Sequence, residues 1–288
     1  MFVVIGPLYA LTDNRPVSWL AVAATLVAFN LASSGCYVVN DLRDVEQDRA
    51  HPRKRRRPIA CGEVTPRQAG VFAAVLFGLA ALFAGSTFLT ATPRAAGLVA
   101  LALGLYVLNV TAYSLLLKRI VILDVVSLAA GFVLRVLGGC AAASVEPSTW
   151  LLNCTFFLSM FLAFGKRLGE RRTMGEQGHS ATTARAVQSV YTDDILRMVM
   201  VMTAVATLVL YAGYIQARDE KYTFGFNLLW LTVLPATYAL LRSILLVERG
   251  EYDDPTELAV HDRPFQAAIA IYGLVTVGVI VAVGVLRE

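Results

Sequence analysis

A run of acidic residues at the end of a long apolar segment has the clearest chemical potential in this sequence. It reads Asn40-Asp41-Leu42-Arg43-Asp44-Val45-Glu46-Gln47-Asp48-Arg49. On a helix, Asn40, Asp44 and Asp48 are four residues apart and drift by about 40° per step, so they share a face, with Asp41 close to Asp48 in angle. Carboxylates on one face repel one another unless a cation lies between them. Hard oxygen ligands suit Mg²⁺, which keeps several waters and bridges to substrate phosphates.

We therefore predict that Asn40, Asp41, Asp44 and Asp48 bind Mg²⁺ and that the three aspartates are catalytic. The alternative is a solvated helix end with alternating charges. That alternative does not explain why the acids directly follow an apolar segment.

A basic segment, His51-Pro52-Arg53-Lys54-Arg55-Arg56-Arg57-Pro58, follows the acidic motif. Five consecutive cations can anchor a loop beside anionic lipid headgroups. They can also bind phosphates, and arginine is suited to bidentate contact. Because they lie so close to an acidic metal motif, we favour a phosphate role for at least one of them, with Lys54 and Arg57 as candidates.

The elements that must position these residues are membrane helices. The chain has 288 residues, of which 57% are hydrophobic and 16% charged. Its mean hydropathy is +0.63. This composition excludes a disordered protein and leaves too little charge to cover a soluble domain. The remaining class is a polytopic all-α membrane protein, since each span needs about 20 apolar residues.

Apolar segments between polar breaks predict eight spans and one short element. The short element covers about 1–12. The spans run roughly over 17–39, 68–90, 95–117, 121–143, 149–165, 196–216, 225–247 and 266–286. Breaks such as Thr92-Pro93-Arg94 carry turn chemistry. We expect one domain over 1–288.

Charge asymmetry between the loops predicts the orientation. Counting Arg and Lys, seventeen fall in the loops at 41–67, 118–120, 166–195 and 248–265, and four fall in the opposite loops. The positive-inside rule places the first set in the cytoplasm, so we expect a multi-pass membrane protein whose long polar loops are cytoplasmic. Most acids lie on the same face, which suggests a site for a metal and an anionic ligand. The net charge of +4 hides this separation.

The cysteines and histidines suggest no further site. Cys36, Cys61, Cys140 and Cys154 are far apart, so we expect buried structural thiols rather than a zinc site or disulfides. The three histidines have no metal-ligand spacing.

The acidic motif, the basic stretch and the segment Arg57-Pro58-Ile59-Ala60-Cys61-Gly62 resemble the first signature of the UbiA superfamily of intramembrane prenyltransferases. The resemblance covers nearly the whole chain. It implies about nine transmembrane helices around a central cavity, with Mg²⁺ and a diphosphate held at the cytoplasmic end.

One departure narrows the reaction that the resemblance implies. Where ordinary members carry a second Asp-rich motif, this chain has Phe164-Gly165-Lys166-Arg167-Leu168-Gly169-Glu170-Arg171-Arg172. Cations there would bind a phosphate directly. The segment, together with the closing Asp254-Pro255-Thr256-Glu257 stretch, is similar to the decaprenyl-phosphate phosphoribosyltransferase branch. That branch implies 5-phosphoribosyl-1-diphosphate as donor, a polyprenyl phosphate as acceptor and a product used in cell-wall arabinan synthesis. Arg197 stands where an acid is expected.

The other candidate substrate-binding residues are polar groups in or beside the spans. Lys166, Arg167 and Arg171 are candidates for phosphate contact, and Glu170 for ribose hydroxyls. Lys118 can be a snorkelling anchor, and Arg135 can lock helices in an ion pair or line a polar cavity. Asp124 at a span entrance is costly unless it is paired. Tyr113 and Tyr191 are either interface aromatics or ligand contacts, and Asp262-Arg263 is either part of the site or a cap with a salt bridge.

Two other functions stay open. The first is ordinary prenyl transfer from a prenyl diphosphate to an aromatic or quinone acceptor. The second is a transporter or lipid-binding protein without catalysis, which inverted repeats and broken mid-membrane helices would support. Membrane lipids and a second copy of the chain are possible partners, and nucleic acid is not.

Overall fold

The computed structural model describes residues 2–12, 17–50, 54–176, 191–218, 222, 225–251 and 255–287, and within this part of the chain every regular element is a helix. The α-helices are α1 (Phe2–Thr12), α2 (Trp19–Arg43), α3 (Val45–Ala50), α4 (Pro66–Thr90), α5 (Pro93–Leu115), α6 (Leu123–Ala142), α7 (Thr149–Glu176), α9 (Asp193–Ala217), α11 (Val233–Glu248), α12 (Pro255–His261) and α13 (Arg263–Arg287). Three short 3₁₀ helices join them: η1 (Lys54–Arg56), η2 (Leu117–Arg119) and η3 (Leu228–Thr232).

Four of the long helices begin at a hydroxyl residue that the sequence supplies. Ser18, Thr65, Thr92 and Thr192 each accept a hydrogen bond from the backbone N–H three residues on. At Thr65 the Gln68 side chain bonds back to the cap, which completes a capping box. Each cap satisfies a donor that has no partner inside its helix. Proline follows the cap in α4 and α5, where its missing N–H costs nothing.

Eight helices of the described chain are long and apolar enough to cross a membrane, which confirms the eight predicted spans. The chain is therefore a multi-pass membrane protein. The short predicted element is α1, of 11 residues. The predicted boundary at 165 is wrong, because α7 continues to Glu176. Residues 166–172 are mostly strong helix formers, so nothing in them stops the helix at the end of the apolar stretch.

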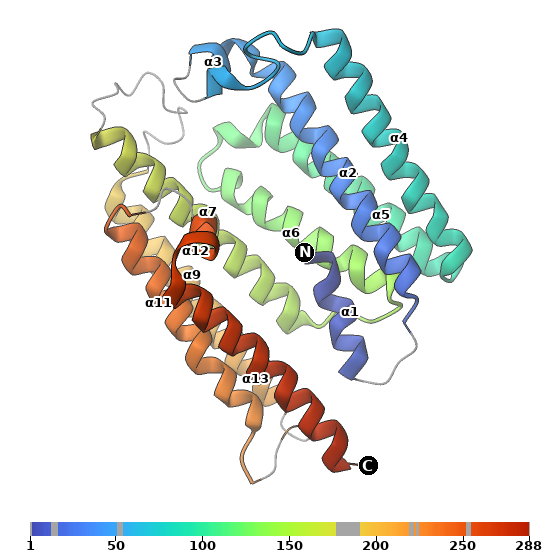
Figure 1. Cartoon of the computed structure of the whole chain (residues 1–288), viewed down its shortest axis with the longest axis vertical. Coiled ribbons are helices and arrows are strands. Elements are labelled where there is room, and N and C mark those ends of the chain that lie inside the picture. Colours follow the sequence, from blue (N-terminus) through green and yellow to red (C-terminus); the bar gives the residue numbers. More distant parts are fainter. Residues whose placement is uncertain are drawn as a thin grey trace. The chain divides into compact units, whose positions relative to one another are not determined.

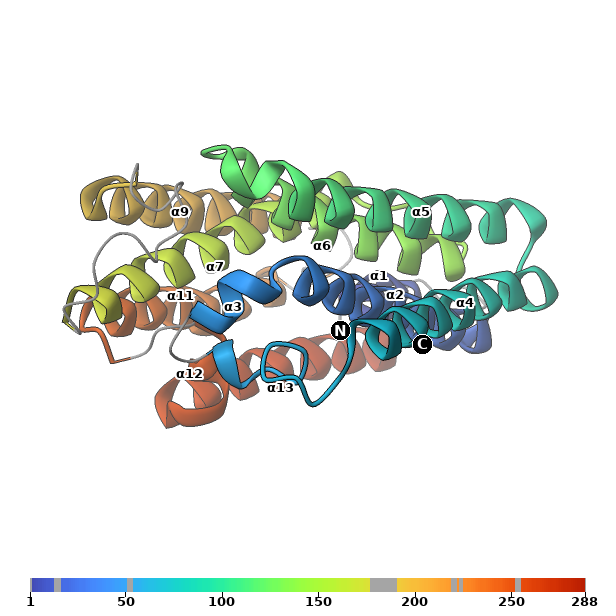
Figure 2. The ribbon, with the colours of Figure 1, turned by 90° about the horizontal axis from the view of Figure 1, so that it is seen from above.

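The described chain divides into two compact units. The expectation of a single domain over 1–288 therefore stays a prediction. The first unit comprises Met1–Ile120 and Ala130–Pro147. In it α2 packs against α4 and α5 (Figure 1 and Figure 2). Small residues line this contact: Ala28, Ala32, Ala80, Ala84 and Ala102 are all buried in one cluster with Phe29 and Tyr106. Small side chains let helix backbones approach closely, which is how helices associate in lipid.

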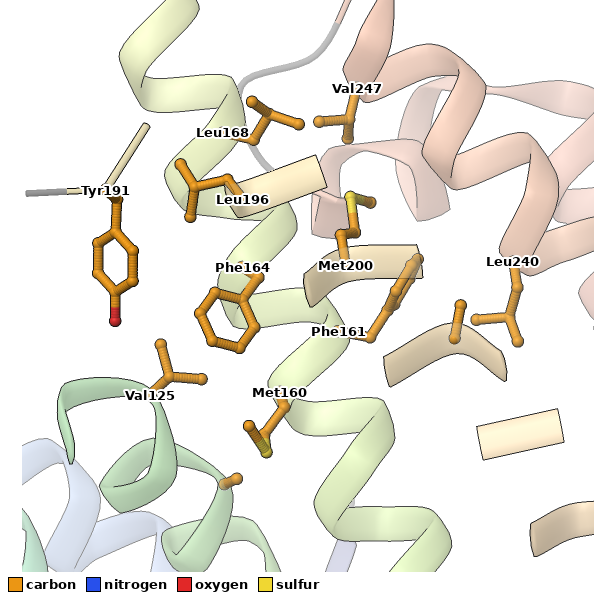
Figure 3. Close-up of a cluster of buried hydrophobic side chains, with 12 residues drawn as sticks. Val125, Met160, Phe161, Phe164, Leu168, Tyr191, Leu196, Met200, Leu240 and Val247 are labelled. Carbon is orange, nitrogen blue, oxygen red and sulfur yellow. The ribbon is translucent and has the colours of Figure 1, made fainter. Parts of the chain in front are cut away.

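The second unit comprises Val121–Ala129 and Ser148–Glu288. Here α7 packs along α9, and α11 packs against α13. Figure 3 shows the buried core of this unit, in which Phe161, Phe164 and Leu168 of α7 meet Leu196 and Met200 of α9. Large apolar side chains fill this core, in contrast to the alanines of the first unit.

The four cysteines agree only in part with the prediction of buried thiols. Cys36 and Cys140 are buried, Cys154 is half-buried and all four are free. Cys61 is exposed, so the prediction was wrong there. It follows the basic segment in a polar turn rather than in an apolar helix.

Gly139 lets α1 approach α6 closely, and this contact generates a prediction. A Cβ at Gly139 would lie 1.8 Å from the backbone oxygen of Val3. Gly139→Ala must therefore push α1 away, and we expect it to lower the free energy of unfolding by about 1–3 kcal/mol. Thermal unfolding in detergent measures the effect. Gly104→Ala on α5 is the control, since a Cβ there meets nothing within 4 Å. Equal midpoints for the two variants would contradict the packing.

Candidate functional site

The acidic motif spans the junction between α2 and α3 in the first unit. Asp44 is the C-cap of α2, and α3 starts at the next residue. The backbone N–H of Asp44 donates to Asn40 at 3.0 Å, and that of Asp48 donates to Asp44 at 2.8 Å. These bonds keep the four-residue spacing through the junction, as the sequence predicted.

A cation lies between two of the carboxylates, and the protein itself supplies it. Arg57 Nη1 donates to Asp41 Oδ1 at 2.7 Å and to Asp48 Oδ2 at 2.8 Å. Asp48 is buried, whereas the Arg57 side chain is 38% exposed. Arg49 Nε donates to the carbonyl of Ala60 at 3.0 Å and so ties the basic segment back to α3. The basic segment thus folds over the acidic one.

The third carboxylate pairs with a residue far away in the sequence. Lys118 Nζ, in η2 at the end of α5, lies 2.9 Å from Asp44 Oδ1 and 2.8 Å from Asp44 Oδ2. Both side chains are mostly buried, so the pair is poorly screened by solvent. The structure therefore brings together Asp41, Asp44 and Asp48 with Arg57 and Lys118 as two ion-paired groups.

The donor chemistry of this group fits Mg²⁺, although the four-residue ligand set is not assembled in one place. Two carboxylate oxygens converge on a single cationic atom, as they would on a metal ion. Within the described residues no three His, Cys, Asp or Glu side chains lie close enough to hold a metal. Mg²⁺ is commonly bound by one or two carboxylates together with waters and substrate phosphates. Asp41 and Asp48 are therefore the better-placed ligands, and the set of Asn40, Asp41, Asp44 and Asp48 stays a prediction.

A second polar group is buried in the second unit around Asp124. Arg167 Nη2 of α7 lies 2.5 Å from Asp124 Oδ2, with both side chains less than a tenth exposed. The Tyr191 hydroxyl donates to Asp124 Oδ1 at 3.1 Å. Burial raises the pKa of Tyr191, and the Asp124 charge raises it further, so the hydroxyl stays a donor at neutral pH. Asp124 is thus paired, as its position at a span entrance requires.

This second group also holds a strained turn. Ile122 has φ +71°, a left-handed conformation that a β-branched residue rarely adopts. Its N–H donates to the Tyr191 hydroxyl at 2.7 Å, and its carbonyl accepts from Val125 and Val126 in the first turn of α6. Tyr191 therefore connects the turn before α6 to the Asp124–Arg167 pair.

Arg167 keeps one donor that the protein does not use. Its Nε is buried and has no hydrogen-bond partner within the described chain. A buried donor without a partner is costly, so Arg167 Nε is available to a ligand or a water molecule. This observation is consistent with phosphate binding by Arg167.

The remaining predicted residues are scattered over both units. Arg135 of α6 contacts Tyr106 of α5, and Lys166 is exposed on α7. Arg171 Nε donates to Asp193 at 2.8 Å. Lys54 begins η1, and Tyr113 is half-buried on α5. The side chain of Glu170 lies outside the described part of the structure, as do Asp254 and the side chains of Thr256 and Glu257.

Arg197 and Asp262, two residues whose roles the sequence left open, both form ion pairs. Arg197 donates to Asp194 at 3.1 Å and to Glu248 at 3.0 Å. Asp262 accepts from the Phe265 backbone at 2.8 Å and pairs with Arg242 through both oxygens, at 3.2 and 2.8 Å. The bond from Arg242 lowers the pKa of Asp262. Asp262 is therefore a helix cap whose partner is Arg242, on another helix.

Sequence reasoning missed Tyr106, which accepts a hydrogen bond from Arg135 inside the membrane. Its position carried a signal, since Tyr106, Asn109 and Tyr113 follow the i, i+3, i+7 spacing of one helix face.

Comparison with known proteins gives a match to one family over most of the chain. The model of the UbiA prenyltransferase family matches residues 1–269. A protein of Mycolicibacterium smegmatis named decaprenyl-phosphate phosphoribosyltransferase is 34% identical over 276 residues, which cover 92% of this chain and 83% of the relative. A protein of the same name from Corynebacterium glutamicum is 36% identical over 259 residues, 89% of this chain and 74% of the relative.

Solved structures show the same fold. A UbiA homolog from Archaeoglobus fulgidus bound to GPP and Mg²⁺ has a TM-score of 0.67 at 16% identity, with 97% of this chain and 95% of that chain covered. The same homolog bound to DMAPP and Mg²⁺ has a TM-score of 0.66, also at 16% identity and with the same coverage.

The hydroxyl of Tyr191 generates a prediction. Tyr191→Phe removes the donor to Asp124 and the acceptor for Ile122, so we expect the free energy of unfolding to fall by about 1–3 kcal/mol. Thermal unfolding in detergent is the measurement. Tyr238→Phe on α11, whose side chain is 48% exposed, makes the same chemical change and should leave the midpoint in place. A Tyr191→Phe midpoint equal to the control would show that the bridge contributes nothing.

Proposed function

Because the chain belongs to the UbiA prenyltransferase family, we propose that it transfers 5-phosphoribose from 5-phosphoribosyl-1-diphosphate to a polyprenyl phosphate such as decaprenyl phosphate, releasing diphosphate. The observation that carries this proposal is the cationic stretch of α7. Lys166, Arg167 and Arg171 stand where the resemblance leads one to expect a second acidic motif, and Arg167 has a buried donor without a partner among the described residues. The names of the relatives support the same reaction.

The residues of the first unit suit the departure of diphosphate. Displacement at the anomeric carbon builds positive charge on the sugar and negative charge on the leaving group, as in glycoside cleavage. Asp41 and Asp48 would hold Mg²⁺, which supplies charge neutralisation to the diphosphate when bound. Arg57 already lies against these two carboxylates and Lys118 against Asp44, and both cations can turn toward phosphate oxygens. Catalysis would rest on positioning and electrostatic stabilisation.

No strong base is required for the acceptor. A polyprenyl phosphate is already an anion at neutral pH, so its oxygen can attack without losing a proton first. The cations of α7 would hold a phosphate directly, and Glu170 would contact the ribose hydroxyls. Tyr191 and Asp124 would fix Arg167 in place, since both belong to its hydrogen-bonded group.

We further propose that these groups work at the cytoplasmic face of the bacterial inner membrane and that the product serves cell-wall arabinan synthesis. The charge asymmetry of the loops supports the orientation. A donor of this kind is a soluble phosphate ester, which fits a cytoplasmic opening.

Prenyl transfer to an aromatic or quinone acceptor is the second candidate. Two of the solved structures with the same fold are bound to GPP or DMAPP with Mg²⁺, which favours it. A direct assay separates the two. Purified protein is incubated with Mg²⁺ and either labelled phosphoribosyl diphosphate with polyprenyl phosphate, or GPP with a phenolic acceptor. We expect labelled lipid only from the first mixture. Turnover of GPP without labelled lipid would contradict the proposal.

Asp44→Asn tests the acidic motif in the same assay. The change keeps the size of the side chain but removes the charge that pairs with Lys118, and we expect turnover to fall about 10²–10³-fold. Glu46→Gln is the control, because Glu46 is exposed in the same segment. Unfolding midpoints of both variants show whether they are folded. A folded Asp44→Asn protein with full turnover would exclude a catalytic role for Asp44.

A further inference from the structure

Arg135 is a charged residue deep inside a membrane span. It lies 12 residues after Leu123, the first residue of α6, and seven before Ala142, the last. At about 1.5 Å per residue it is roughly 18 Å from the start of the helix and roughly 10 Å from its end, so the charge lies well inside the span. A cation at such a depth is costly and normally has a counter-charge.

The contacts of Arg135 with described residues supply no such counter-charge. Its Nη2 donates to the Tyr106 hydroxyl at 2.8 Å, and its guanidinium lies 4.7 Å from the centre of the Tyr106 ring. Tyr106 is neutral and packs in turn on Phe29, with ring centres 5.4 Å apart. Within the described chain no carboxylate forms an ion pair with Arg135, whereas Arg167 and Lys118 each have one. The contact with Tyr106 orients the guanidinium but leaves its charge uncompensated.

Within the first unit, a row of polar side chains on α5 lies beside Arg135. Tyr106, Asn109 and Tyr113 lie on one face of α5, which leads toward Lys118. Gly131 lies one turn before Arg135 on α6 and faces this row of side chains. A Cβ at Gly131 would lie 3.5 Å from Asn109 Nδ2 and 3.6 Å from Tyr106 Cε2. A polar strip thus connects Arg135 with the end of α5 that carries the Lys118–Asp44 pair.

We propose that Arg135 binds a phosphate monoester of a substrate, which provides the missing counter-charge. This inference rests on the proposed function, in which two such groups occur: the 5-phosphate of the donor and the phosphate of the acceptor lipid. The planar guanidinium suits bidentate contact with phosphate oxygens. Tyr106 is then a positioning residue that holds the guanidinium through its hydroxyl and ring. A prenyl diphosphate with a neutral acceptor offers no phosphate monoester, so Arg135 would also determine specificity.

Binding of two probes to the purified full-length protein tests the assignment. Ribose 5-phosphate represents the donor group and farnesyl phosphate the acceptor group, and the rise of the unfolding midpoint with probe concentration gives each Kd. We expect Arg135→Gln to weaken one probe about 10- to 100-fold, since a charged hydrogen-bonded contact is lost, and the other by less than about threefold. The weakened probe identifies the phosphate that Arg135 binds.

Further variants separate binding from a structural role. Arg135→Lys keeps the positive charge but loses the bidentate geometry of the guanidinium, so its affinity for the probe should lie between those of Arg135→Gln and the wild type. Tyr106→Phe should weaken the same probe by a smaller factor. Arg197→Gln is the matched control, because Arg197 already has two carboxylate partners, and it should bind both probes as the wild type does. If Arg135→Gln does not fold, the probe affinities of Arg135→Lys and Tyr106→Phe test the proposal instead. Wild-type affinity for both probes in both variants overturns it.

The outcomes also distinguish this inference from the proposed function. The role of Arg135 alone is overturned if the wild type transfers phosphoribose and a folded Arg135→Gln variant has the wild-type KM for each substrate. A raised KM for the substrate whose probe is weakened, with a smaller change in kcat, supports it. A wild type that binds neither probe and transfers no phosphoribose overturns both proposals.

Discussion

The repulsion among three aspartates at the end of a membrane helix is the constraint on which the candidate site depends. Asp41, Asp44 and Asp48 follow an apolar span, where charges are poorly solvated. The structure balances them with Arg57 and Lys118, whose nitrogens lie 2.7–2.9 Å from the carboxylate oxygens. Each cation comes from a different segment, so the basic loop and the end of α5 are fixed relative to α2 by the same charges that would bind a metal and a phosphate.

Burial and pairing of charge follow a consistent rule in the described parts of both units. Asp48, Asp124 and Asp262 are all buried, and each accepts from an arginine. Removing one partner of such a buried ion pair leaves the charge of the other uncompensated, which strongly destabilises the folded protein. Arg135 stands apart, because its described partner is a neutral tyrosine. A paired charge can be purely structural, whereas an unpaired one in a span calls for a ligand, and this difference separates Arg135 from Arg167 and Lys118.

The sequence predicted those features that depend on local chemistry. Apolar length gave the eight spans, and the predicted break at Thr92-Pro93-Arg94 coincides with the start of α5. The four-residue spacing from Asn40 to Asp48 survives the break at Asp44. The sequence could not predict which charged residues form ion pairs. Lys118 is 74 residues from its partner Asp44, and Arg167 lies on a different helix from its partner Asp124. The extension of α7 to Glu176 was missed because hydropathy marks the apolar stretch rather than the end of the helix, and Tyr106 was overlooked as part of an apolar stretch.

The central claim is that Asp41 and Asp48, the carboxylates paired with Arg57, bind a divalent cation together with the diphosphate of the donor. Anomalous diffraction from crystals containing Mn²⁺ and phosphoribosyl diphosphate tests it directly, since Mn²⁺ prefers oxygen ligands as Mg²⁺ does. The account predicts an anomalous peak about 2.0–2.3 Å from oxygens of Asp41 or Asp48 and of the diphosphate, with Arg57 displaced from at least one carboxylate. Bound donor with no peak at these carboxylates, and both Arg57 contacts intact, would contradict it.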